Sequence, residues 1–160
     1  MSEINRIIDQ FRRAFDGEAW HGPAVLPLLS DVTAVQAAAH PVAGTHSIWE
    51  LVLHIGTWEN ACKRRLEGDP AQLTDDEDWM AISQFSEAEW ERTKEKLVAT
   101  HEELLSAIAK VDESRLDRPI IEGASFQSSS VYVTLHGVVQ HDLYHAGQIA
   151  LLKKAIAAVE

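Results

Sequence analysis

Apolar residues recur at intervals of three and four along four stretches of the chain, the spacing that places side chains on one face of an α-helix. The first stretch covers residues 2–15 and precedes Gly17, a residue typical of helix ends. The second starts near Thr45 or His46 and stops before the Gly-Asp-Pro breaker at 68–70. Both stretches predict long amphipathic helices.

The other two stretches lie in the second half of the chain. Ser86 opens the third and has Glu89 three residues later, the spacing of a capping box. The fourth follows a polar loop, is capped by Ser129 or Ser130, and runs toward Val159. The sequence thus predicts four long helices.

These helices can bury their apolar stripes only against one another, because their outer faces are polar. Strand signals are weak, and the Pro- and Gly-containing connection after the first helix has room for short helical pieces at 24–29 and 33–39. We therefore predict an all-α four-helix bundle, most simply one domain over residues 1–160. A homodimer and a monomer both remain open for such a bundle, because no surface stripe in the sequence decides between them.

Composition and charge narrow the partners and the compartment. The formal net charge of −11 disfavours nucleic acids and anionic membranes as partners, because it would repel both. Cys62 is the single cysteine, which rules out an intrachain disulfide and favours a reducing compartment. With no signal-peptide pattern and no apolar run of about 20 residues, a cytoplasmic location is expected.

Two of the eight histidines stand out in the segment QHDLYHAGQI. His141 and His145 are four residues apart, so on a helix they point the same way, toward the bundle interior. A divalent cation would satisfy both imidazoles at once, whereas neighbouring carbonyls, carboxylates or solvent could satisfy them separately. The pair alone supports both interpretations equally.

The segment HDLYH also invites comparison with the zincin motif, with Asp142 in place of the general-base glutamate. Aspartate is one methylene shorter, and Gln148 and Leu151 stand where the metzincin extension needs Gly and His. The one downstream carboxylate is the terminal Glu160. A third protein ligand is therefore expected from upstream.

His54 is the best upstream candidate, because it interrupts the apolar stripe of the second helix. His101 has a similar place on the third helix and is the main rival, kept as a core or second-shell residue. His46 and Glu50 precede His54 by two turns and one turn, so they could bind the site or line its mouth, although Glu50 fits a solvated face equally well. The remaining histidines, His21, His40 and His136, are expected in loops or on the surface.

The segments HSIWELVLHIGTWE and GVVQHDLYHAGQI, with AWHGPAVLPLLSDVTAVQA before them, resemble the DinB-like (YfiT-like) superfamily of metal-dependent enzymes. The resemblance covers nearly the whole chain and implies a four-helix bundle. It also implies that His54, His141 and His145 are metal ligands, typically for nickel or zinc. The family is functionally mixed: it includes transferases that use low-molecular-weight thiols such as bacillithiol, and a mycothiol-dependent isomerase.

Three neutral imidazoles would leave a metal its 2+ charge and an open position, which can activate water or hold a thiol as thiolate. Gln148, three residues after His145, could orient a ligand or a bound water, and Asp142 and Tyr144 have second-shell roles at most. Cys62 is interpreted as a small core residue, and Trp58 as a wall of the cavity.

Three functions remain open at this point. The first is a metal-dependent enzyme acting on small molecules, with thiol S-transfer slightly favoured over hydrolysis by the resemblance alone. The second is a non-catalytic metal-binding or stress-response bundle. The third is a helical interaction module with buried histidines and no metal.

Overall fold

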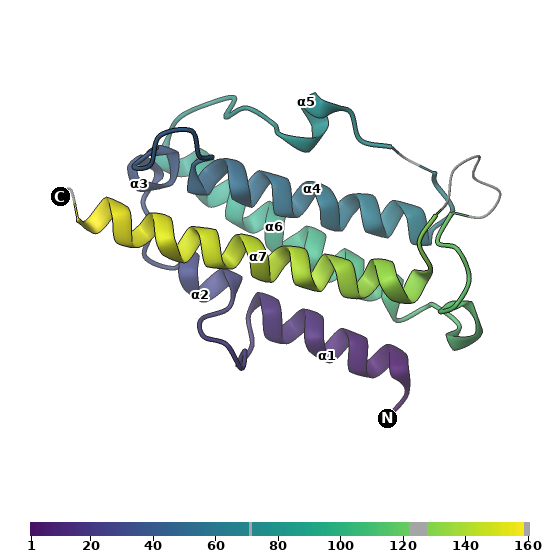
Figure 1. Ribbon diagram of the computed structural model, residues 1–160. Coiled ribbons are helices and arrows are strands. Elements are labelled where there is room, and N and C mark those ends of the chain that lie inside the picture. The colour runs from purple at the N-terminus through teal and green to yellow at the C-terminus, as the bar shows by residue number, and fades with distance from the viewer. Residues whose placement is uncertain (71, 122–127, 159–160) are drawn as a thin grey trace.

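The computed structural model describes residues 1–70, 72–121 and 128–158. Within these ranges the regular secondary structure consists of helices, without a strand (Figure 1). Four helices pack side by side as a bundle in which α4 contacts both α6 and α7, while α1 lies against α6 and α7. Their bounds are α1 Glu3–Phe15, α4 Ile48–Leu66, α6 Glu87–Ile108 and α7 Val131–Ala157. The predicted all-α four-helix bundle is confirmed.

The connections carry shorter elements, α2 (Val25–Leu29), α3 (Ala34–Ala38), α5 (Asp75–Asp78) and the 3-10 turn η1 (Glu113–Arg115). The first two correspond to the short helical pieces predicted after the first helix. The other two are additional to the prediction.

The start of α4 corrects the sequence prediction, which placed it at residue 45 or 46. Ser47 has extended backbone, and its hydroxyl accepts the N–H of Glu50 at 3.2 Å. The Glu50 carboxylate in turn accepts the N–H of Ser47 at 2.7 Å. This reciprocal capping box satisfies two N–H groups of the first turn and makes Ile48 the first helical residue.

Serine caps also open α6 and α7. The Ser86 hydroxyl accepts the N–H of Glu89 at 3.1 Å, but the Glu89 carboxylate accepts from Arg92, so the structure shows only the first half of the predicted box. Ser130, one of the two predicted caps, opens α7. The predicted end near Val159 lies outside the described residues, as does Glu160.

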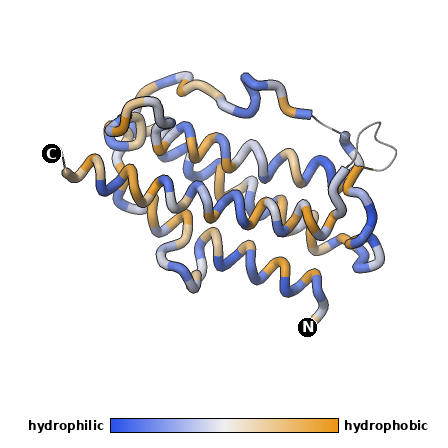
Figure 2. Tube along the Cα trace, in the orientation of Figure 1, coloured by the Kyte–Doolittle hydropathy of each residue, from blue (hydrophilic) through white to orange (hydrophobic). Residues whose placement is uncertain are grey.

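The buried apolar residues form two clusters along the bundle, as the alternation of apolar and polar positions in Figure 2 leads one to expect. One cluster joins α2 and α3 to the start of α4 and the end of α7, and the other joins α1 to the end of α4 and the start of α7. They meet on α4 between Ile55 and Cys62, and on α7 between Val139 and Ala146. Buried polar residues lie at this junction.

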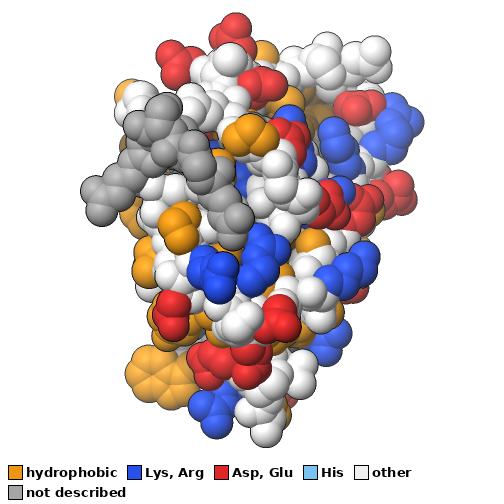
Figure 3. All heavy atoms as spheres, turned by 90° about the vertical axis from the view of Figure 1, so that its right-hand side faces the viewer, with side chains coloured by type: hydrophobic (Ala, Val, Ile, Leu, Met, Phe, Trp, Pro, Cys, Tyr) orange, Lys and Arg blue, Asp and Glu red, His pale blue; other side chains and the backbone are white. Residues whose placement is uncertain are grey.

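On the end face in Figure 3, acidic and basic side chains are interspersed. Across the described ranges, none of the helices has both the length and the apolar character that crossing a bilayer requires.

Candidate metal centre

Three imidazoles from two helices converge at the junction of the two apolar clusters. His54 comes from α4, and His141 and His145 come from adjacent turns of α7. The Nε2 atom of His141 lies 2.9 Å from Nε2 of His54 and 3.1 Å from Nε2 of His145. The three rings therefore direct the same nitrogen toward a common point.

The outer nitrogens of two of these rings have acceptors that fix the position of their protons. Nδ1–H of His54 donates to the carbonyl oxygen of Asp78 at 2.8 Å, and Nδ1–H of His145 donates to Oε1 of Gln148 at 2.7 Å. A neutral imidazole with its proton on Nδ1 has a bare lone pair on Nε2. The inward nitrogens of His54 and His145 are thus both acceptors.

His141 differs from its two neighbours, because its Nδ1 atom is buried and has no hydrogen-bond partner. The nearest carboxylate oxygen given for it is Oδ1 of Asp142, at 3.6 Å. The Nε2 atoms of His54 and His145 both present a lone pair to Nε2 of His141. A neutral His141 has at most one proton on Nε2, so it cannot donate a hydrogen bond to both.

Burial keeps all three imidazoles neutral. It lowers the pKa of His54 and His145 from their ordinary value, and it lowers the pKa of His141 to about 3, with repulsion from the two neighbouring rings adding to the effect. Neutral nitrogen donors at one point are the ligand set that a divalent transition metal prefers, and ligands held by carbonyl partners are typical of such sites. The residues present fit a metal ion, with one ligand atom from each histidine.

The segment around Asp78 and Trp79, which was not predicted to lie at the site, covers it. The indole of Trp79 stacks on His54, with ring centroids 3.8 Å apart, and His46 stacks on Trp79 at 3.5 Å. The Asp78 carboxylate accepts the indole N–H of Trp58 at 2.7 Å. The segment after α4 therefore both orients His54 and shields its ring.

A sequence signal for this segment was present at Thr74 and Glu77. The Thr74 side chain accepts the N–H of Glu77, and the Glu77 carboxylate accepts the N–H of Thr74. This spacing predicts a helical turn, but the sequence does not predict that the turn lies over His54.

The remaining predicted residues lie as follows. His46 stacks on Trp79, which covers His54, and Glu50 caps α4 and lies 3.1 Å from His40. His101 lies apart from the three imidazoles, and its Nδ1 atom is 2.6 Å from Glu59. Asp142 and Tyr144, the two residues predicted to have at most a supporting role, differ in exposure: Asp142 is fully buried and Tyr144 is exposed.

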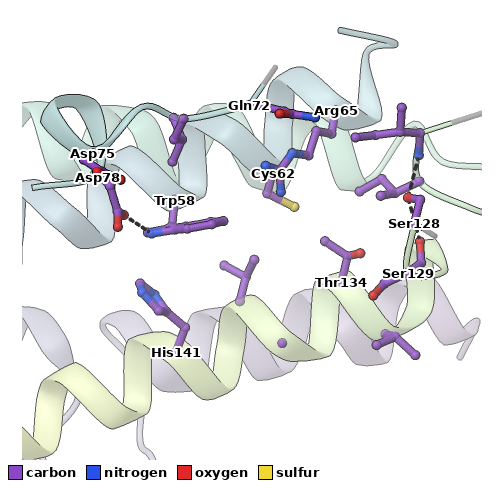
Figure 4. Close-up of a pocket in the computed structure, with 16 residues that line it drawn as sticks. Trp58, Cys62, Arg65, Gln72, Asp75, Asp78, Ser128, Ser129, Thr134 and His141 are labelled. Carbon is purple, nitrogen blue, oxygen red and sulfur yellow. Dashed lines mark hydrogen bonds between the residues drawn. The ribbon is translucent and has the colours of Figure 1, made fainter. Parts of the chain in front are cut away.

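A cavity of about 660 Å³ adjoins the three histidines on the side of His141 (Figure 4). It runs between α4, which contributes Trp58, Cys62 and Arg65, and α7, which contributes Thr134 and His141. Its size is typical of a small-molecule site. Burial raises the pKa of the Cys62 thiol to about 12, so this thiol stays protonated and is not a nucleophile.

Comparison with known proteins connects this geometry to a family. A family model described as the DinB superfamily matches residues 19–149, which confirms the predicted resemblance. The chain is also similar to a crystal structure of the conserved protein of locus from Enterococcus faecalis, with a TM-score of 0.62 and 16% identity over 97% of this chain and 93% of that chain. At this identity the likeness shows a shared fold alone. No curated protein matches the chain.

Proposed function

The chain belongs to the DinB superfamily, and on that premise we propose that it is a metal-dependent enzyme that acts on small molecules. The proposed ligands are His54, His141 and His145, and the proposed metal is nickel or zinc, as the family resemblance implies. The proposed reaction is S-transfer from a low-molecular-weight thiol to an electrophile, with hydrolysis as the next candidate. A single domain over residues 1–160 is part of this proposal.

One observation carries the proposal: three neutral imidazoles direct Nε2 toward one point beside a cavity. A structural metal site is normally closed by four protein ligands, whereas a set of three histidines would leave a metal ion able to bind a small molecule as well. That arrangement supports chemistry on a small molecule better than it supports a purely structural ion.

In S-transfer the thiol sulfur forms a bond to the electrophilic carbon. The bond from that carbon to the leaving group breaks, the leaving group keeps the electron pair, and the thiol proton passes to solvent. When bound at the centre, a divalent ion would favour the thiolate over the thiol.

The chain's own residues prepare this chemistry. The Asp78 carbonyl and the Gln148 side chain keep the N–H groups of their histidines turned outward. Trp79 covers one face of His54 and excludes water from it. The cavity beside His141 gives a small molecule access to the three histidines.

Metal content tests the first part of the proposal. Protein purified without an affinity tag is expected to contain close to one nickel or zinc ion per chain by elemental analysis, and added metal is expected to raise the melting temperature of the metal-free protein. His54→Ala should abolish both effects. His136→Ala, on the same helix as His141, is the matched control and should preserve them. Wild-type protein without bound metal and without a thermal shift would refute the proposal.

A thiol screen tests the second part. Metal-loaded protein is incubated with monochlorobimane and a panel of low-molecular-weight thiols, and the initial rate of fluorescence is compared with that of His54→Ala. A rate well above that of the variant with at least one thiol is expected. Equal rates with every thiol would contradict S-transfer. If the metal is nevertheless bound, the alternative is a non-catalytic metal-binding or stress-response protein.

A further inference from the structure

The cavity beside His141 extends along α7, away from the three histidines. Thr134 and Val138 line it two turns and one turn before His141, and in Figure 4 the Thr134 side chain points from α7 toward α4. Seven residues of helix separate Thr134 from His141, a rise of about 10 Å. The cavity therefore offers an elongated space that begins beside a proposed metal ligand.

Apolar side chains form much of the wall of this space. Trp58 and Cys62 line it from α4, and Leu73 and Val138 contribute further carbon surface. Cys62 is buried and its thiol stays protonated, so it presents a small apolar surface. Such walls favour methylene groups, because apolar surface gains free energy when it leaves water.

The polar atoms along this stretch already have partners in the protein. The Thr134 hydroxyl donates to the carbonyl oxygen of Ser130 at 2.9 Å, and the indole N–H of Trp58 donates to the Asp78 carboxylate at 2.7 Å. A charged group placed here would lose water and gain little in return. The stretch between His141 and Thr134 therefore suits an uncharged chain.

Charged residues of both signs also line the cavity. Asp78 is held by Trp58 and lies 3.2 Å from Nδ1 of His54, and Asp75 is exposed to solvent, where water screens its charge. The Arg65 guanidinium packs over the Trp58 ring, with Cζ 5.5 Å from the ring centroid. Charges that are mixed in sign, and engaged or screened, give no preference for an anionic or a cationic tail.

From these observations we infer that the cavity binds the uncharged aliphatic tail of a small molecule whose polar head reaches the three histidines. Thr134 is the specificity-determining residue for the length of that tail. The inference deepens the proposed function and rests on it, because His141 is both a proposed metal ligand and part of the cavity wall.

Thr134 can be replaced without leaving a buried partner unsatisfied. The Ser130 carbonyl that accepts its hydroxyl also accepts the backbone N–H of Thr134, at 2.9 Å. The backbone bond persists whatever the side chain is. A larger side chain at 134 therefore takes up cavity space at little cost to the helix.

The experiment measures binding by calorimetry to protein loaded with nickel or zinc, using hydroxamic acids, whose heads bind such ions. Octanohydroxamic acid is expected to bind at least about tenfold more tightly than butyrohydroxamic acid, since each buried methylene is worth up to roughly fourfold and ordering the chain offsets part of this. Thr134→Phe should reduce this advantage to less than about threefold. Gln140→Phe, at an exposed position of α7 outside the cavity lining, is the matched control and should retain it.

The charge of the tail gives a second readout. Analogues of octanohydroxamic acid with a carboxylate or an ammonium group at the far end are expected to bind at least about tenfold more weakly than the methyl-ended acid. Tighter binding of either charged tail, equal affinity for long and short tails, or a length advantage that survives Thr134→Phe would overturn the inference.

Octanol tests the cavity without the metal centre. In metal-free protein it is expected to shift the methyl NMR signals of Val138 and Thr134 more than an equal concentration of butanol does. Absence of these shifts would overturn the inference even where metal is bound. Protein that shows the shifts but takes up no ion would refute the proposed function and still support an apolar-chain site, so the two failures are distinguishable.

Discussion

Two buried groups of polar side chains lie where the apolar clusters of the bundle meet, and both include a histidine that interrupts an apolar helix face. The first is the three-histidine centre, formed by His54, His141 and His145 between α4 and α7. The second, which we call the enclosed carboxylate cluster, consists of Glu59 of α4, His101 of α6 and Asp142 of α7. They share two helices but differ in chemistry.

In the three-histidine centre, the Nδ1–H groups of His54 and His145 donate to acceptors outside the centre, and the Nε2 lone pairs of these rings point toward its middle. In the enclosed carboxylate cluster, Nδ1 of His101 lies 2.6 Å from Glu59, and the His101 ring stacks on Phe15 with centroids 3.7 Å apart. Burial raises the pKa of Glu59 to about 8 and raises that of Asp142 well above its ordinary range. The enclosed carboxyl groups therefore hold protons at neutral pH.

The contrast shows that burial alone does not identify a ligand. His54 and His101 are both nearly inaccessible, yet only His54 directs a free lone pair at other imidazoles beside a cavity. A metal ion needs deprotonated donors that converge. The enclosed cluster instead carries protonated carboxyl groups, and Glu59 Oε2, His101 Nε2 and both carboxyl oxygens of Asp142 are buried without a hydrogen-bond partner among the described residues.

The two groups should respond differently when one of their histidines is replaced by alanine. His145→Ala should weaken nickel or zinc binding more than about 100-fold, because loss of a ligand exceeds the 10–100-fold cost of losing a residue that orients one. His101→Ala should leave metal affinity unchanged and reduce the free energy of unfolding by about 2–4 kcal/mol, since it leaves a cavity and removes the partner of Glu59.

Metal affinity is measured by competition with a chromophoric chelator, and unfolding by urea titration of the metal-free protein. Equal losses of metal affinity in His101→Ala and His145→Ala would contradict the assignment of metal binding to the three-histidine centre alone. The contrast between the two groups would also fail if His145→Ala destabilised the metal-free protein as strongly as His101→Ala.

The sequence allowed much of the bundle to be predicted, because periodicity and capping are local. The apolar spacing and the serine caps at Ser86 and Ser130 located the long helices to within a few residues. The start of α4 was the exception: the pair Ser47 and Glu50 has capping-box spacing, but Glu50 was interpreted as a residue near the site or on a solvated face.

The site was only partly predictable, because its support comes from residues distant in sequence. His54 and the pair on α7 were chosen from helix faces and family resemblance, and the structure brings these three rings together. The contacts of Asp78 and Trp79 with His54 join positions 24 and 25 residues apart through a connection without periodicity. Local pattern gives no information about such a contact.

A smaller effect sharpens the account of how the centre is oriented. Gln148→Leu should weaken metal binding about 10–100-fold, because His145 would lose the acceptor that fixes its proton on Nδ1. Gln140→Leu, at an exposed position on the same helix, should leave the affinity unchanged. Competition with the chelator measures both variants, and equal affinities would show that Gln148 does not support the ligand.

The smallest expected effect concerns pH and tests the enclosed carboxylate cluster alone. The pKa of Glu59 is raised from 4.5 to about 8, so between these values the folded chain holds a proton that the unfolded chain has released. Stability must therefore fall as pH rises through this window. The buried histidines have lowered pKa values and cost stability only on the acid side of 6.5, where they would gain protons on unfolding.

Between pH 6.5 and 8 the pH dependence of the free energy of unfolding therefore comes from the carboxyl groups and not from the buried histidines. Metal-free wild-type protein should lose about 1–2 kcal/mol of unfolding free energy over this range, since one proton is worth about 1.4 kcal/mol per pH unit. Glu59→Gln should reduce this dependence by the share of Glu59, and Glu95→Gln, at an exposed position on α6, should retain it in full. Urea titrations at half-unit intervals measure the slope. If the free energy of unfolding of the wild-type protein is constant or rises with pH, Glu59 is ionised in the folded state. The enclosed carboxylate cluster would then contain a buried negative charge, and its contrast with the three-histidine centre would be lost.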